Sequence, residues 1–312
     1  MTQIICGVDV SSTTLDARIG PDGPSIQVKR THQGVAELAA FCRLHGAGLA
    51  VMEATGGYEK LPFNLLWAAG IPCALANPRA VRRFAEAMGI LEKSDRIDTG
   101  VIARFAAVKK LAPQPPLPPG QQRLRALSDR LRQITQSIVA QTNQRRLIDD
   151  PMVLASIDEV IALLRRQARA FEAAIVDLLD SEPLWQALNA ACRSIKGVAL
   201  RTIARLMAEL PEIGTLSGKA IAKLAGLAPL ARDSGKHSGN RHVRGGRAGV
   251  RSILFIVASI VRRFNRDFAD FSKKLLDAGK PRKVIRIALA RKLLVRLNAK
   301  ARDVRQAMPN LS

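Results

Sequence analysis

Four acidic residues in the first hundred positions have an arrangement suited to divalent-metal chemistry. Asp95 and Asp98 stand three residues apart at the start of a helix-like run, a spacing that places both on one helix face. Asp9 and Glu53 each end a short apolar run typical of a buried strand. Mg²⁺ prefers oxygen ligands, and two such ions about 3.5–4 Å apart commonly promote phosphodiester cleavage. The four acids together predict a Mg²⁺ or Mn²⁺ site of the nuclease kind.

Each acid also has a structural explanation. Acids at a helix start complement the helix dipole. Asp9 could occupy a turn at its strand end, and Glu53 could cap the turn at Gly56-Gly57. Singly, none of the four is strong evidence for a metal. Their order along the chain favours the metal site.

The glycine-rich segment Asp233–Arg247 has a composition suited to phosphate binding, because it offers backbone N–H groups together with cations. Ser234 has two explanations, as a hydrogen-bond donor to a nucleic-acid backbone or as a nucleophile activated by a metal or a base. The residues alone favour the first. The cations expected to contact nucleic acid are Lys236, Arg241, Arg244 and Arg247.

Other reactive side chains have ordinary alternatives. His237 and His242 could act as bases, but histidines in such loops more often contact phosphate. A tyrosine recombinase would have to use Tyr58, the single tyrosine of the chain. Tyr58 follows a glycine turn at an expected helix start, where a packing role is the more usual explanation.

Charge and composition restrict the class of protein. The 312 residues are 47% hydrophobic, which suits a globular chain, and the net charge of +23 indicates a polyanionic partner. Residues 232–312 carry 21 basic and five acidic side chains, a net charge of +16. The four cysteines form no C-x-x-C pair and predict buried thiols in a reducing compartment. With no leader segment or membrane-spanning run expected, we predict a cytoplasmic, nucleoid-associated protein.

The order of expected elements is typical of an α/β fold. Three strands come first, and helices and strands then alternate up to about residue 108. This order suits a mixed five-stranded sheet of the ribonuclease H type, with Asp9 and Glu53 side by side and Asp95 and Asp98 on a helix above them. We therefore predict a catalytic domain at residues 1–110.

The rest of the chain is predicted to be mainly helical. Five prolines within Pro113–Pro119 indicate a stiff linker, assigned to residues 111–120. Residues 121–183 have a coiled-coil-like pattern, which fits an antiparallel hairpin, a dimerising coiled coil or a helix pair packed on the rest of the protein. Residues 184–312 form the expected helical nucleic-acid-binding domain.

Motifs spread over nearly the whole chain resemble the DEDD transposases of the insertion-sequence-110 family, which includes pilin-gene invertases. The N-terminal matches are Gly7-Val-Asp9-Val, Thr14-Leu-Asp16, Met52-Glu-Ala-Thr-Gly-Gly-Tyr58, Asn77-Pro-Arg79 and Lys93-Ser-Asp-Arg-Ile-Asp98. The C-terminal matches are Leu224-Ala-Gly-Leu-Ala-Pro229, Asp233-Ser-Gly-Lys236 and Gly245-Gly-Arg247.

The resemblance implies a RuvC-like N-terminal domain in which Asp9, Glu53, Asp95 and Asp98 bind metal. It implies a helical coiled-coil region and then a C-terminal transposase domain. It assigns the family's serine nucleophile to Ser234, with a covalent serine–DNA intermediate, and it implies a structured non-coding RNA as guide.

The sequence thus predicts a DNA recombinase that mobilises its own insertion element and forms homo-oligomers, either dimers or tetramers. One alternative is a site-specific invertase with the same active site. A second is a RuvC-like nuclease or junction resolvase that only hydrolyses DNA, for which Ser234 would be dispensable. A third is a nucleic-acid-binding protein with a decayed site, against which the four intact acids argue.

Overall fold

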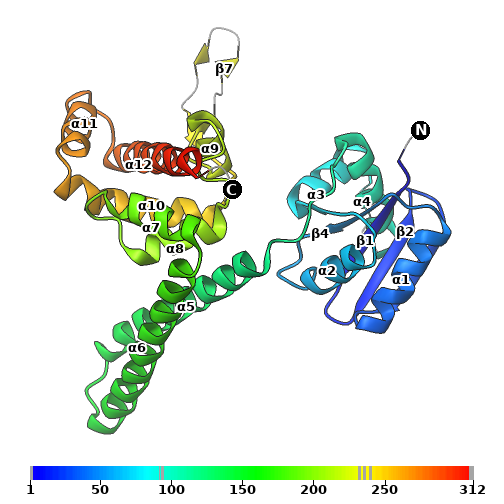
Figure 1. Ribbon diagram of the computed structural model, residues 1–312, viewed down its shortest axis with the longest axis horizontal. Coiled ribbons are helices and arrows are strands. Elements are labelled where there is room, and N and C mark those ends of the chain that lie inside the picture. The colour runs from blue at the N-terminus through cyan, green and yellow to red at the C-terminus, as the bar shows by residue number, and fades with distance from the viewer. Residues whose placement is uncertain are drawn as a thin grey trace. The chain divides into compact units, whose positions relative to one another are not determined.

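The structure is a computed structural model that describes residues 3–90, 92, 95–230, 233–234, 237–238 and 241–308. The chain divides into two compact units, Met1–Leu117 and Pro118–Ser312. Figure 1 shows the sheet within the first unit and the helices that make up most of the second. The two units are described separately.

The first unit contains the expected mixed sheet, with strand order β3-β2-β1-β4-β5. The hairpin strands pair in antiparallel fashion, whereas β1, β4 and β5 run parallel. This order places the first and fourth strands next to each other, which confirms the predicted fold. The strands are β1 (Ile5–Val10), β2 (Thr14–Ile19), β3 (Ser25–Lys29), β4 (Leu49–Glu53) and β5 (Cys73–Ala76).

Helices cover both faces of the sheet. Alternate residues of a strand point to opposite faces, so Cys6 and Val8 of β1 pack with α1 and α2, while Ile5 packs with α3 and α4. The sheet is therefore the middle of three layers, and α4 lies on the face toward which odd-numbered β1 residues point. The helices are α1 (His32–Leu44), α2 (Lys60–Ala68), α3 (Pro78–Ala87) and α4 (Asp95–Lys109).

The proline-rich segment that ends the first unit is attached to the sheet. The backbone N–H of Gln114 donates to the Cys73 carbonyl at 2.8 Å, at the start of β5. The second unit then begins with α5, whose first residue is Pro119. Proline is tolerated there because its missing N–H would have no partner inside the helix.

The second unit is mostly helical, as predicted. Its first two helices, α5 (Pro119–Arg145) and α6 (Pro151–Asp180), are long and pack against each other. They form the hairpin that extends from the other helices of this unit in Figure 1. Leu124 and Leu131 of α5 and Ile175 of α6 share one buried core with the C-terminal helices. The remaining helices are α7 (Pro183–Arg193), α8 (Leu200–Glu209), α9 (Gly218–Leu224), α10 (Ala248–Phe264), α11 (Arg266–Asp277) and α12 (Arg282–Ala307).

The four cysteines are free, and all four are buried as predicted. Burial raises the pKa of the Cys73 thiol to about 12, so this side chain stays protonated at neutral pH. None of the helices in the described ranges has both the length and the apolar character that crossing a bilayer requires.

Candidate active site

The sheet register places Asp9 and Glu53 side by side. In the parallel pair of β1 and β4, Val8 is the partner of Met52, and Asp9 and Glu53 are the next residues on each strand. Both side chains are partly exposed at the carboxyl ends of their strands. Neighbouring strands lie about 4.8 Å apart, so the two acids come close at this edge, as the sequence indicates.

A close approach at Gly7 brings α4 onto the same face. Gly7 and Asp9 point to the same side of β1 because they are two residues apart. A Cβ atom at Gly7 would lie 2.0 Å from the Thr99 carbonyl oxygen and 2.9 Å from the Ala103 nitrogen. Thr99 directly follows Asp98, which is partly exposed. Because Gly7 has no side chain, α4 can approach β1 closely. This approach brings Asp98 toward the end of β1 where Asp9 lies.

The complete tetrad stays a prediction. Asp95 is the first residue of α4, but its side chain is outside the described ones. Among the described side chains, no three His, Cys, Asp or Glu residues form a group that could hold a metal ion. The donor chemistry of the four predicted ligands nevertheless suits a hard ion, because all four are carboxylates.

A fifth acid, Asp16, adjoins this edge and was not among the predicted site residues. It is the direct cross-strand partner of Asp9, and its Oδ1 accepts a hydrogen bond of 2.8 Å from Gln27 Nε2 on β3. Glu53, Asp9, Asp16 and Gln27 therefore form one row across four strands. Like charges placed directly opposite destabilise a sheet, so this row favours a cation nearby. Asp16 is visible in the sequence as part of Thr14-Leu-Asp16, but its place opposite Asp9 depends on the hairpin register.

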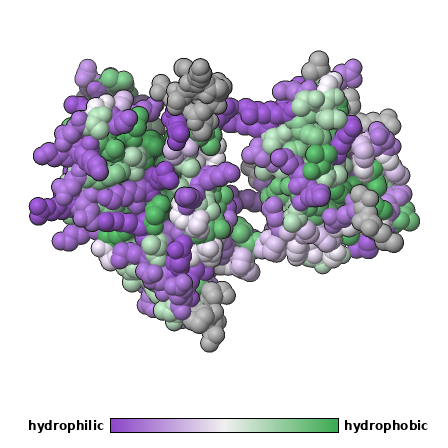
Figure 2. All heavy atoms as spheres, turned by 90° about the horizontal axis from the view of Figure 1, so that it is seen from above, coloured by the Kyte–Doolittle hydropathy of each residue, from purple (hydrophilic) through white to green (hydrophobic). Residues whose placement is uncertain are grey.

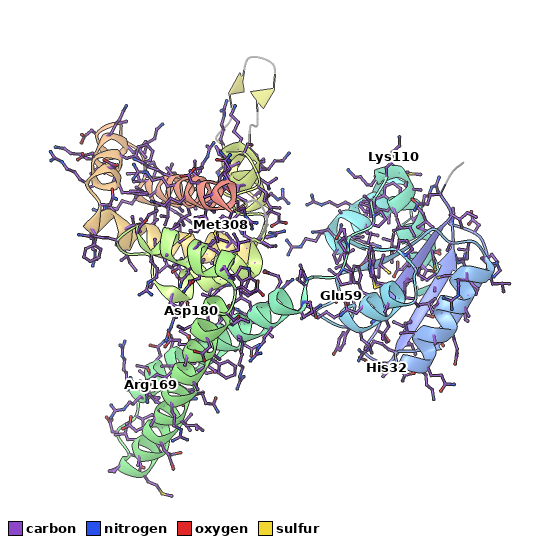
Figure 3. The ribbon with its side chains drawn as sticks, viewed as in Figure 1. His32, Glu59, Lys110, Arg169, Asp180 and Met308 are labelled. Carbon is purple, nitrogen blue, oxygen red and sulfur yellow. The ribbon has the colours of Figure 1, made fainter. Side chains whose placement is uncertain are left out.

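A buried carboxylate binds the backbone of the loop that follows Glu53. Glu59, labelled in Figure 3 at the start of α2, is only 9% exposed. Its Oε2 accepts hydrogen bonds from the backbone N–H groups of Thr55 at 3.0 Å and Gly57 at 2.8 Å. The Thr55 hydroxyl donates to the Glu53 carbonyl at 3.2 Å. These contacts fix the chain immediately after a predicted metal ligand.

Ser234 belongs to the second unit, whereas the four acids belong to the first. Its backbone lies in β7 (Asp233–Ser234), which pairs with β8 (His237–Ser238) so that Ser234 is opposite His237. The base of this hairpin is the pair of β6 (Pro229–Leu230) and β9 (His242–Val243). The side chains of residues 231–240 are outside the described ones, and Lys236 lies there too.

The three predicted arginine contacts have different surroundings. Arg241 and Arg244 are exposed. Arg247 instead forms a two-point ion pair with Glu212, in which Nη2 lies 2.5 Å from Oε1. Burial by itself would raise the pKa of the Glu212 carboxyl, but the hydrogen bonds from Arg247 hold it below its usual value. Arg247 therefore anchors the base of the loop as well as adding charge to it.

Two family models match this chain. Residues 6–148 match a DEDD-type model described as a transposase, and residues 189–273 match one described as the transposase IS116/IS110/IS902 family. The chain belongs to the IS110 family of transposases. Two relatives, each described as a pilin gene-inverting protein, come from Moraxella lacunata and Moraxella bovis. Each is 28% identical over 309 residues, which cover 94% of this chain and 94% of the relative.

Membership of the IS110 family identifies the first unit as its RuvC-like domain and the chain as an enzyme of DNA strand transfer. The second match begins in α7 and ends in α11, and it includes the Ser234 hairpin. Figure 2 shows hydrophilic residues over much of the visible face of the second unit, on the left. The net charge of +16 over residues 232–312, which belong to this unit, suits a polyanion such as DNA.

We expect the double variant Arg241→Gln/Arg244→Gln to bind DNA less tightly and with weaker salt dependence. Each lost phosphate contact lowers the slope of log affinity against log salt by about 0.9, so loss of both lowers it by about 1.8. Anisotropy titrations of a labelled duplex at several salt concentrations measure the slope. Lys109→Gln/Lys110→Gln removes the same charge from exposed positions of the RuvC-like unit. Equal slopes in the arginine variant and the wild type would contradict the assignment.

Proposed function

We propose that this IS110-family transposase mobilises an insertion element by cutting and rejoining DNA with a metal-binding acid tetrad and a serine nucleophile. The observation that supports this most is the junction of β1, β4 and α4. There the register aligns Asp9 with Glu53, and the contact at Gly7 draws in the turn of α4 that contains Asp98. Asp95 begins the same helix.

The roles of the residues follow from the chemistry of phosphoryl transfer. Asp9, Glu53, Asp95 and Asp98 would hold Mg²⁺ or Mn²⁺, which when bound neutralises charge on the phosphate. The Ser234 oxygen would attack phosphorus, form a phosphoserine bond and lose its proton. The displaced sugar oxygen would take up a proton, and reversal of this step would rejoin a strand. Because the acids and Ser234 belong to different units, the serine hairpin must meet the tetrad within one chain or between two.

A structured non-coding RNA is the proposed guide for choosing the DNA sites. The resemblance of the whole chain to the family supports this, as does the net charge of +16 over residues 232–312. The place of action would be the nucleoid in the bacterial cytoplasm. Purification of the protein from cells that carry the native locus, followed by sequencing of the bound RNA, tests the proposal. If none of the bound RNA mapped to the DNA that flanks the gene, a guide encoded in the element would be contradicted.

A site-specific invertase is the second candidate function, favoured by the description of the two Moraxella relatives as pilin gene-inverting proteins. Invertases and transposases of this kind would share the acids and the serine. A plasmid carrying the gene with its native flanking DNA separates them, because transposition gives new junctions at a target whereas inversion only reverses a segment. Long-read sequencing of the plasmid population detects either product.

We expect Asp95→Asn to weaken Mg²⁺ or Mn²⁺ binding at least about tenfold. Substitution of a residue that merely orients a metal ligand already lowers metal affinity by that factor. Calorimetric titration of both proteins, with nucleic acid present if free protein binds weakly, measures the affinity. Glu37→Gln is the matched control, because Glu37 is an exposed acid on α1, on the other face of the sheet. Unchanged affinity in Asp95→Asn would contradict its place in the tetrad.

We also propose that the α5–α6 hairpin mediates a dimer or tetramer. Several large apolar side chains are exposed along it, among them Val139 at 54%, Val160 at 40% and Leu163 at 41%. The triple variant Val139→Ser/Val160→Ser/Leu163→Ser should shift sedimentation toward the monomer without disturbing the core residues of the hairpin. A monomeric wild type, with and without nucleic acid, would contradict the proposal.

A further inference from the structure

Tyr58 has an exposed aromatic ring that rests on a cation. Its side chain is 47% exposed, and the Arg30 guanidinium carbon lies 5.1 Å from the ring centroid. Arg30 is itself fixed, because its Nε donates to the Ser12 carbonyl at 2.9 Å. A cation over the face of an aromatic ring is attracted to its π-electrons. The contact therefore holds the ring in place without burying it.

The loop that carries Tyr58 is held by its own hydrogen bonds. The Tyr58 N–H donates to the Thr55 carbonyl at 3.2 Å, and the buried Glu59 carboxylate binds the N–H groups on either side of Gly56. Gly56 and Gly57 have φ values of 65° and 108°, which other residues rarely adopt. The position of the ring is thus set by the loop rather than by insertion into a core.

The Tyr58–Arg30 pair lies at the same sheet edge as the acids. β1 and β3 both run antiparallel to β2, so Arg30, just after β3, is at the edge where Asp9 lies near the end of β1. Tyr58 follows β4. The Tyr58–Arg30 contact therefore connects the segments after β4 and β3, the two strands on either side of the β1–β2 pair. Glu59 and His32, labelled in Figure 3, begin the helices at this edge. Ligands of open α/β sheets bind outside such carboxyl ends.

We propose that Tyr58 stacks on an unpaired base of the DNA strand whose neighbouring phosphate is held at the acids, with Arg30 supporting the ring from its other face. The proposal rests on the proposed function. An exposed ring takes a base of any sequence, because every base offers a π-face. Arg30 also places a positive charge at an edge where the acids would otherwise repel the phosphates. Tyr58 is thus a substrate-binding residue and not a nucleophile.

The single tyrosine allows a direct test in the full-length protein. Because the chain contains one tyrosine, 3-fluorotyrosine labelling gives one ¹⁹F signal, from residue 58. A short single-stranded oligonucleotide is titrated without metal, next to an oligonucleotide of equal length with abasic sites throughout. Stacking is expected to shift the signal with the intact oligonucleotide alone. Anisotropy measured in parallel reports whether each oligonucleotide binds.

The outcomes separate this proposal from the proposed function. Saturated binding without a ¹⁹F shift, or equal shifts with both oligonucleotides, would overturn stacking and leave DNA binding intact. Absence of binding by either oligonucleotide would contradict a strand-binding role for Tyr58 and would leave the metal-dependent proposed function standing. A shift produced by protein concentration alone would instead assign Tyr58 to a contact between copies of the chain.

Substitutions give the energetic test. Tyr58→Leu should weaken binding of the intact oligonucleotide about 5- to 150-fold, the cost of losing one stacked base. Affinity for the abasic oligonucleotide should not change. Tyr58→Phe keeps the ring and should bind within about twofold of wild type. If Tyr58→Leu lowered both affinities equally, its effect would be a general one on the loop and the stacking assignment would be wrong.

Discussion

Ser234→Ala should bind DNA with wild-type affinity but lose strand exchange and the covalent protein–DNA adduct. A serine nucleophile exchanges the broken phosphodiester bond for a phosphoserine bond and so keeps its energy for rejoining. Attack by water would instead release that energy. Removing the attacking oxygen leaves no route to that adduct, so the expected loss of recombination is complete within the sensitivity of the assay. A denaturing gel with end-labelled DNA, metal and the RNA encoded by the element detects the adduct.

The same hairpin provides a matched control. Ser238 pairs across from Asp233 in the strand that faces Ser234, so Ser238→Ala removes a hydroxyl from the same basic loop. This variant should retain adduct formation, whereas Asp9→Asn should lose both cleavage and adduct. An adduct that persists in Ser234→Ala would refute the nucleophile. Efficient cleavage by wild type with no adduct would favour the hydrolytic nuclease.

Gly7→Ala is expected to separate α4 from the sheet and to abolish metal binding. The added methyl carbon would lie 2.0 Å from a backbone oxygen of Thr99, a distance at which the helix itself must move. Overpacking of a core costs typically 1–3 kcal/mol, and here we expect about 3 kcal/mol because backbone atoms cannot rotate away. Denaturant unfolding followed by circular dichroism measures the loss, and calorimetry measures the metal affinity.

Gly48→Ala is the control for the glycine experiment. Its new carbon would meet only the flexible Gln3 side chain, at 3.3 Å, so its unfolding free energy should stay close to that of the wild type. If Gly7→Ala were as stable as Gly48→Ala and bound metal normally, α4 would not depend on this contact, and the account of how Asp98 reaches the sheet would be wrong.

The fold could be predicted because its signals are local. The apolar runs that end at Asp9 and Glu53 mark buried strands, and their order along the chain suits only a few topologies. Contacts between distant segments have no such signal. Nothing in the sequence around Glu212 indicates that it binds Arg247, and the opposition of Asp9 and Asp16 depends on a hairpin register that one residue of slip would change.

The parts of the candidate site rest on different sequence signals. The acids follow from residue type and position, whereas the assignment of Ser234 as a nucleophile came from the family resemblance, because a serine among glycines and cations equally suits a backbone contact. The sequence favoured packing for Tyr58. The structure leaves its ring half-exposed, because Glu59 fixes the loop through backbone groups that composition does not reveal.

The attachment of Gln114 to β5 leaves at most four residues, Pro115–Pro118, between that contact and the start of α5. A chain of four residues spans at most about 14 Å, and three of these four are prolines, whose φ angles are locked. The segment can therefore add little length between the two units. Whether the proposed serine acts on the acids of its own chain or on those of another copy would then depend on this segment. Lengthening this segment with glycine and serine would then change which copy reacts while leaving the chemistry of either unit unaltered.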